Sequence, residues 1–349
     1  SVVDWSYAQS PISIIWCVRD DGVLLSMTYS REQSVFGWTR HTTQGDFKSA
    51  AAIREGDADF TYYIVDRVLG STTVKYIERM RRRDLTDVQD SYFVDGGLTL
   101  DSPVVITGFT NANPVVVTAS SHGFSNGDVV DITGIMVADS TETRGFSPDT
   151  EIEGSGYTVA GVTTHTFQLQ NNGANVNGTA FSVYHSAGEV REATTTVSGL
   201  WHLEGKVVVA LANGYVVRDL TVSSGTVTLP SAASRVHVGL PYTSEMQSLK
   251  LDNANPADTL QGRDKKISRL SLRFETTLGG WYGPDRSHMR EIKYGLPAQY
   301  GQPATWVTGD KGVTMSPSWN KDGYVIVQQR DPLPMNLLAL IPDVVAGGN

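Results

Sequence analysis

Residues 123–127 read Gly-Phe-Ser-Asn-Gly and match the G-x-S-x-G pattern of a serine-hydrolase nucleophile elbow. That chemistry needs a strand before the serine and a helix after it, so that the hydroxyl is held on a strained turn beside an oxyanion hole. Here the residues at 128–132 alternate as a strand does, and no helix can begin there. We therefore expect a glycine-rich β-turn at Ser125 and no catalytic role for its hydroxyl.

The histidines, the cysteine and the acidic residues do not form any sequence motif that indicates a catalytic or metal site. The seven histidines form neither H-x-x-x-H nor H-E-x-x-H, although a zinc or iron site assembled from distant strands stays open as an alternative. The single cysteine, Cys17, excludes an intrachain disulfide and a cysteine-rich zinc site. With 37 acidic residues, some carboxylate pair would always suit a glycosidase, so the sequence favours none. We expect no enzyme activity, no cofactor and no metal.

Basic residues gather at Arg79, Arg81, Arg82 and Arg83. This run could pair with phosphate, or it could form a solvated face or a salt-bridged seam between subunits. Acidic residues follow it closely in sequence: Asp84, Asp87 and Asp90. We favour the seam, because locally compensated charges leave little net field. The chain as a whole has 28 basic and 37 acidic residues and a formal charge of −9, which argues against a general nucleic-acid scaffold.

The composition favours many short strands. Hydrophobic residues make up 40% and charged residues 19% of the 349 residues, the balance of a globular protein. Valine and threonine, which suit a pleated surface, are abundant, and the 34 glycines exceed the usual share of about 7%. Asp-Gly at 21–22 and Asn-Gly at 213–214 each separate two apolar runs, as hairpin turns do. Strands are predicted first at 12–18, 23–29, 35–40, 47–53, 60–68 and 73–80.

We expect an all-β fold with less than about 15% helix. Residues 81–95 are the least strand-like and are predicted to hold one short helix, while polar stretches at 137–156 and 279–304 predict long exposed loops or arms. No stretch approaches the roughly 18 apolar residues of a membrane-spanning helix.

The sequence predicts three domains and a linker, in this order: a β-meander or partial β-propeller over 1–97, a linker over 98–109, a small inserted β-barrel over 110–192, and a β-rich C-terminal domain over 193–349. The C-terminal domain is expected to pack on the first one.

Stretches along nearly the whole chain resemble, in order, the large tail proteins of short-tailed double-stranded DNA bacteriophages. In the first part these are IWCVRDDGVLLSMTY at 15–29, GWTRH at 37–41 and IERM at 77–80. The second part is similar to the small β-barrel first described in the ubiquitin-activating enzyme and often inserted into phage tail proteins, through NPVVVT at 113–118, HGF at 122–124 and GD at 127–128. The third part contributes GLWHLEG at 199–205, LP at 229–230, VGLPY at 238–242 and QQRDPLPM at 328–335.

The resemblance implies a non-enzymatic tail nozzle or tail-tube (hub) protein. Such a protein is made in the bacterial host cytoplasm and works in the virion as a homo-oligomeric ring, typically of about six copies, around the genome channel. Its expected partners are the tail adaptor and fibre proteins, and DNA passes it during ejection without specific binding. The acidic balance agrees, because a channel that must release a polyanion should not bind it.

Subunit contacts are expected where aromatic and arginine residues gather, since these types are enriched at interface cores. The residues proposed for the interface are Arg81, Arg82, Arg83, Trp281, Tyr282, Tyr294 and Tyr300. One alternative is a phage tail protein that binds or degrades host surface glycans, with sugar-stacking platforms at Trp281, Tyr282, Trp306 and Trp319. Another alternative is a soluble repeat protein with an adaptor role in a host cell.

Overall fold

The computed structural model describes residues 1–349 apart from 140, 142–143, 253–258, 295–304, 316–318 and 348–349. More than half of the described residues lie in strands, and no α-helix occurs among them. The all-β prediction is therefore confirmed. The helix predicted within 81–95 is only a single 3-10 turn, η1 (Val88–Asp90), whose N-terminal N–H groups are capped by the Asp87 side chain. The other described 3-10 turn is η2 (Trp201–Leu203).

The chain divides into two compact units, which are described separately here. The first unit consists of residues 1–97, 202–209 and 239–349, and the second consists of residues 98–201 and 210–238. The chain crosses between them four times, once within η2 and once within each of three strands: β8 (Asp95–Asp101), β17 (Val207–Ala212) and β20 (Arg235–Leu240). These strands form a four-stranded sheet in the order β18-β17-β20-β8, with β18 spanning Tyr215–Thr221.

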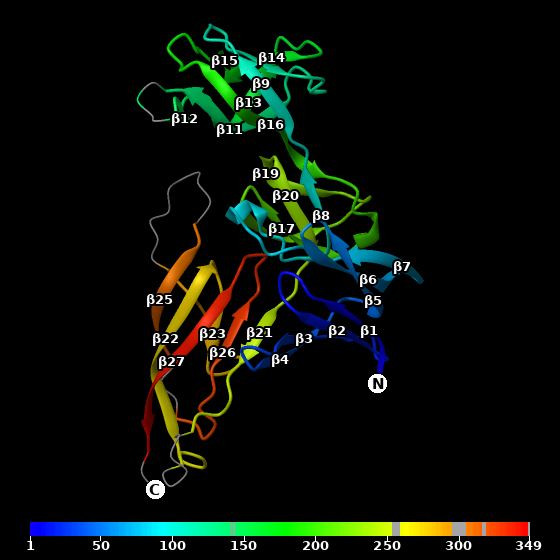
Figure 1. Ribbon diagram of the computed structural model, residues 1–349, viewed down its shortest axis with the longest axis vertical. Coiled ribbons are helices and arrows are strands. Elements are labelled where there is room, and N and C mark those ends of the chain that lie inside the picture. The colour runs from blue at the N-terminus through cyan, green and yellow to red at the C-terminus, as the bar shows by residue number, and fades with distance from the viewer. Residues whose placement is uncertain (140, 142–143, 253–258, 295–304, 316–318, 348–349) are drawn as a thin grey trace. The chain divides into compact units, whose positions relative to one another are not determined.

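Two antiparallel meanders open the first unit (Figure 1). The first sheet has the order β1 (Val2–Ala8), β2 (Ile14–Arg19), β3 (Leu24–Ser30), β4 (Val35–His41). The second has the order β5 (Asp46–Glu55), β6 (Ala58–Leu69), β7 (Thr72–Arg79). The predicted hairpin between β2 and β3 is confirmed, with Gly22 at φ +77°, where a side chain would be strained. All six strands predicted at 12–80 are present, and β1 precedes them.

The two meanders pack face to face as a sandwich. One face of the β1–β4 sheet and one face of the β5–β7 sheet together enclose a core built around aromatic rings. Tyr63 meets Trp16 and Phe47 edge to face, with ring centroids 5.6 Å apart in both pairs. The buried members of this core are Ala8, Trp16, Val18, Leu24, Phe47, Ala50, Tyr63 and Val65. This sandwich positions the surfaces described below.

The C-terminal part of the first unit contains two further sheets. One has the order β21 (Ser244–Gln247), β26 (Ile326–Gln329), β23 (Trp281–Gly283), β24 (Arg290–Glu291). The other has the order β25 (Val307–Thr314), β22 (Lys265–Thr277), β27 (Asn336–Ala346). Their shared core includes Leu270, Leu272, Phe274, Tyr282, Val325 and Val327. The predicted arm at 279–304 is wrong for its described part, because β23 and β24 lie within it; residues 295–304 are outside the described residues.

The second unit contains a closed six-stranded β-barrel, as the sequence predicted. The ring runs β11-β13-β14-β10-β9-β16 and closes where β11 pairs with β16. Its strands are β9 (Val104–Phe109), β10 (Val116–Ala119), β11 (Val129–Ala138), β13 (Gly154–Ala160), β14 (Thr166–Asn171) and β16 (Tyr184–Val197). Two short strands, β12 (Phe146–Pro148) and β15 (Ala174–Asn175), pair at its edges, and β19 (Val227–Ala233) pairs with β16.

Two stretches expected to be irregular contribute to this unit. Strand β9 comes from residues 98–109, which the sequence suggested as a linker. The loop predicted at 137–156 is wrong, because it contains β12, the start of β13 and the fully buried Ile152. The 137–156 stretch is polar, and polar strands that pair at a barrel edge carry little apolar periodicity. Residues 104–109, in contrast, are mostly apolar, and Ile106 and Phe109 belong to the barrel core. The predicted Asn-Gly hairpin is confirmed, since Asn213 and Gly214 both have positive φ between β17 and β18.

Candidate interaction surfaces

Ser125 lies in the turn that the sequence predicted. Its backbone N–H donates to the Asp128 carboxylate at 2.7 Å, and Gly123 and Gly127 both have positive φ. Strand β11 begins at Val129, directly after this turn. The helix that would raise a nucleophile above an oxyanion hole is therefore absent after Ser125.

The histidines are engaged separately. His122 is buried against the rings of Phe124 and Phe167, while His41 shares a 2.7 Å hydrogen bond with Ser26. Burial, with a smaller contribution from the Arg83 charge, lowers the pKa of His41. Among the described residues, no three His, Cys, Asp or Glu side chains come together in a way that could hold a metal ion. In that same part of the chain, no helix is long and apolar enough to cross a membrane.

The arginines at 79–83 do not share one binding partner; Arg79 and Arg82 form separate ion pairs within the chain. Arg82 pairs with Asp57 and Asp84, both at 3.2 Å. Arg79 pairs with Glu55 at 2.9 Å, and its guanidinium lies 3.7 Å from the centre of the Phe60 ring. Asp87 and Asp90, in contrast, cap η1. Exposed pairs of this kind contribute at most about 1 kcal/mol each, so they hold the run in place only weakly.

The aromatic residues proposed for a subunit interface serve mainly the C-terminal core. Tyr282 is 7% exposed and donates its hydroxyl to the Thr314 carbonyl at 3.1 Å. Tyr294 donates to the Gly279 carbonyl at 2.8 Å, and burial raises the pKa of its hydroxyl. Trp281 is half-buried beneath the guanidinium of Arg330, 5.3 Å away. Tyr300 lies outside the described residues.

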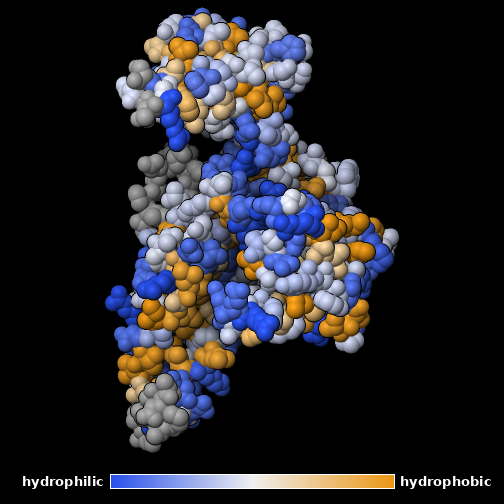
Figure 2. Space-filling model, in the orientation of Figure 1, coloured by the Kyte–Doolittle hydropathy of each residue, from blue (hydrophilic) through white to orange (hydrophobic). Residues whose placement is uncertain are grey.

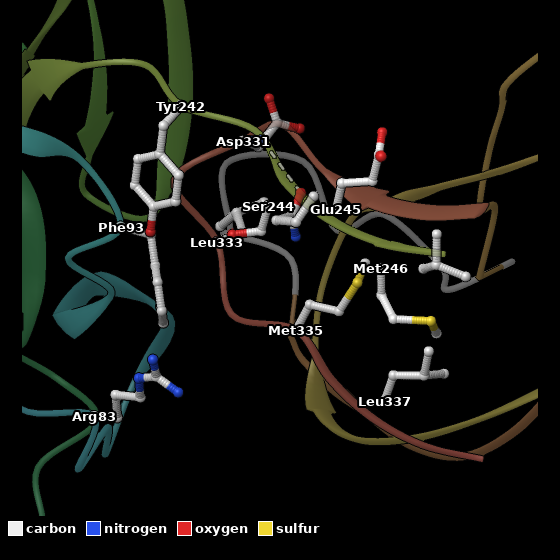
Figure 3. Close-up of a pocket in the computed structure, with 12 residues that line it drawn as sticks. Arg83, Phe93, Tyr242, Ser244, Glu245, Met246, Asp331, Leu333, Met335 and Leu337 are labelled. Carbon is white, nitrogen blue, oxygen red and sulfur yellow. Dashed lines mark hydrogen bonds between the residues drawn. The ribbon is translucent and has the colours of Figure 1, made fainter. Parts of the chain in front are cut away.

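A small pocket of about 230 Å³ lies beside β21 in the first unit (Figure 3). Figure 3 shows Tyr242 and Phe93 on one side of it and Met246, Met335 and Leu337 on the other. Ligand pockets usually measure about 300–1,000 Å³, so this one is small for a substrate. Its Glu245 carboxylate is already bound by Arg286 and Gln328, and the hydrogen bond from Arg286 lowers its pKa. The other lining residues are Arg83, Ser244, Val327, Gln329, Asp331 and Leu333.

The outer face of the β1–β4 sheet is apolar and open to solvent. Residues directly opposite each other in antiparallel strands project from the same face. The register aligns Tyr7, Ile15, Met27 and Trp38 in one row across all four strands, and the ring of Tyr29 lies 5.5 Å from that of Phe36. We call this surface the aromatic face; it consists of Trp5, Tyr7, Ile15, Leu25, Met27, Tyr29, Phe36 and Trp38. Trp5, Phe36 and Trp38 are 64%, 62% and 61% exposed.

The opposite side of the sandwich is a second exposed surface, on which apolar side chains alternate with the ion pairs Lys75–Asp66 and Arg79–Glu55. The register of β5, β6 and β7 places Ile64 beside Ile77, and Phe60 beside Ile53, on the face turned away from the core. We call this surface the aliphatic face; it consists of Ile53, Phe60, Tyr62, Ile64, Val68 and Ile77. Ile77 is 79% exposed and Val68 is 53% exposed. Figure 2 shows hydrophobic residues at the surface over the part that β1–β7 form.

Sequence reasoning did not identify these two faces, although β1–β4 carry a signal for one of them. In β2 (IIWCVR), apolar residues occupy both alternating sets of positions, so this strand presents apolar side chains to both faces of the sheet. Strands of that kind are typical of sheets covered on both sides. A comparison of the chain with protein-family models and with curated proteins found no match.

Proposed function

We propose that this chain is a non-enzymatic structural protein that works in a homo-oligomeric ring, and specifically as the nozzle or tube protein of a short-tailed bacteriophage tail. The observation that carries the structural role is the pair of apolar faces on opposite sides of one sandwich. Monomeric proteins rarely expose continuous apolar patches larger than a few hundred Å². Trp5, Phe36 and Trp38 alone expose on the order of 350 Å², at about 200 Å² per ring side chain.

The tail assignment rests on the resemblance of the sequence stretches and on the charge. A net charge of −9 suits a channel wall that DNA must leave quickly, since few cations are available to hold phosphates. In this role the ring would contact an adaptor and fibre proteins in the virion, and DNA would pass through it without sequence recognition. The ion-paired Arg82 and the half-buried Trp281 remain candidates for contacts with those neighbours.

The proposal is tested on particles. An antibody or gold label against the barrel loop at 172–173, which joins β14 to β15, should decorate the tail of intact virions in electron micrographs. Averaging of the labelled region should show a closed ring with a central channel. Labelling confined to the capsid, or absent from particles altogether, would contradict the tail assignment.

Binding of host surface glycans is a second candidate function, and the aromatic face is the observation that supports it. Flat, exposed tryptophan rings stack on sugar rings, and Trp5 and Trp38 are both more than 60% exposed. Tyr282, proposed from the sequence as part of a sugar platform, is buried and less suited to it. Titration with host oligosaccharides, followed by tryptophan fluorescence, separates the two candidates. A saturable change that Trp5→Ser/Trp38→Ser abolishes would favour the glycan role.

A further inference from the structure

We infer that the aromatic face of one copy docks on the aliphatic face of the next copy, so that the chain assembles head to tail. This inference deepens the proposed ring and rests on its being a homo-oligomer. The two faces lie on opposite outer sides of the same sandwich, because the inner faces of both sheets are used in the core. One copy therefore presents two different apolar surfaces that point away from each other.

Opposite placement of two different surfaces favours a repeating contact. If two aromatic faces paired with each other, association would stop at a dimer and leave both aliphatic faces in water. A contact between unlike faces is heterologous, and it continues until a rotation closes the ring or a fibre grows. Only closure covers every apolar face, including Ile77 with its 79% exposure. The arrangement of faces therefore matches a ring better than a two-fold dimer.

The area available is adequate for a stable contact. Adding Tyr7, which is 42% exposed, to the three large rings brings the exposed area of the aromatic face to roughly 450 Å², more than half of what one partner of a standard interface buries. A standard interface buries about 800 Å² on each partner, including its polar rim. Arg40 projects from the same face opposite Leu25 and forms no ion pair within the described residues, so it is available for the rim.

The packing inside the sandwich shows that such a contact is feasible. There, the ring of Trp16 from the first sheet packs against Tyr63 of the second, and aliphatic residues such as Val18 and Val65 fill the spaces between rings. Trp5 and Trp38 would meet Ile64 and Ile77 of the next copy in the same manner. Stacked sheets are separated by about 10 Å, a spacing that side chains of these sizes fill.

Two double variants test the inference. Trp5→Ser/Trp38→Ser removes the aromatic face, and Ile64→Ser/Ile77→Ser removes the aliphatic face. Val105→Ser/Val183→Ser is the matched control, because these barrel residues are 61% and 63% exposed and belong to neither face. Circular dichroism first establishes that each variant is folded. Sedimentation velocity and mass photometry then measure association over a range of protein concentrations.

We expect the wild-type chain and the control to associate, and each face variant alone to associate at least tenfold more weakly. Mixing the two face variants should restore one-to-one dimers and nothing larger, since each retains the face that the other lacks. Homodimers of the Ile64→Ser/Ile77→Ser variant would overturn the head-to-tail contact in favour of paired aromatic faces. Association of the wild type that neither face variant weakens would refute the inference and leave the ring proposal standing. A wild type that stays monomeric refutes this contact, while labelling of particles decides the tail role independently.

Discussion

Arg67 on β6 forms a buried ion network whose removal has a calculable cost. Its side chain is 3% exposed and donates to both Glu78 carboxylate oxygens, at 2.5 and 2.7 Å. It also donates to the carboxylate of Asp95 at 3.1 Å and to the Thr43 hydroxyl at 3.0 Å. Together these bonds connect β6, β7, the loop before β5 and the start of β8.

We expect Arg67→Met to lower the free energy of unfolding by about 3 kcal/mol. Breaking a buried ion pair by removing one partner costs about 3–5 kcal/mol, because the remaining charge is left without compensation. The lower value applies here, since Glu78 and Asp95 are 22% and 20% exposed and recover some hydration.

Urea unfolding followed by tryptophan fluorescence measures this cost, since Trp16 lies in the core beside β6. The matched variant Arg67→Met/Glu78→Gln/Asp95→Asn carries no unpaired charge and should regain roughly half of the loss. A loss below about 1 kcal/mol for Arg67→Met, or a triple variant as unstable as the single one, would refute the assignment of the network as a buried charge cluster.

Three further predictions concern single side chains. Hydrogen bonds from the Ser49 hydroxyl and then the Ala50 N–H lower the pKa of Asp4, so Asp4→Asn should cost about 1 kcal/mol at pH 7. Because the folded pKa is the lower one, that difference should be lost in urea titrations as the pH falls through it. Asp131→Ala should cost about 2–3 kcal/mol in thermal unfolding, since the buried carboxylate accepts bonds from Ser234, Asn213 and Gly156. Ser125→Ala should leave thermal stability within about 0.5 kcal/mol and change no esterase signal, whereas loss of a measurable activity would reinstate the hydrolase hypothesis.

Local turn chemistry and strand patterns in the sequence were sufficient for much of the fold. Gly22 and Gly214 sit at positive φ where the Asp-Gly and Asn-Gly pairs predicted hairpins. Strands β2 to β7 agree with their predicted positions to within about two residues, because runs rich in β-branched and aromatic residues are bounded there by glycine-containing turns, whereas β1 was not predicted. Polar strands such as β12 were missed, since their pairing with β11 depends on partners distant in sequence.

The candidate surfaces were less predictable from the sequence. In the sequence, adjacent aromatic residues such as Trp281 and Tyr282 suggest a subunit interface. In the structure, Tyr282 packs against residues of β22 and β25 that are distant in sequence, and it is buried. Conversely, Trp5 and Trp38 are more than 30 residues apart, and only the register of four strands brings them onto one face. The type of a side chain limits which residues could form an interaction surface, whereas the strand topology determines which of them are exposed to solvent.

The contrast between the barrel and the β1–β4/β5–β7 sandwich locates the assembly surface within the chain. The barrel closes on itself, so its apolar residues, including Phe167 and Ile132, are fully buried inside the ring of strands and its exposed apolar residues are scattered. The sandwich has only one interior but four sheet faces, and the two outer faces still carry tryptophan, phenylalanine and isoleucine. Apolar residues on an outer face add nothing to the stability of the isolated sandwich and lower its solubility. Their presence is accounted for if another sheet covers them, and a second copy of this sandwich offers a face of the required chemistry.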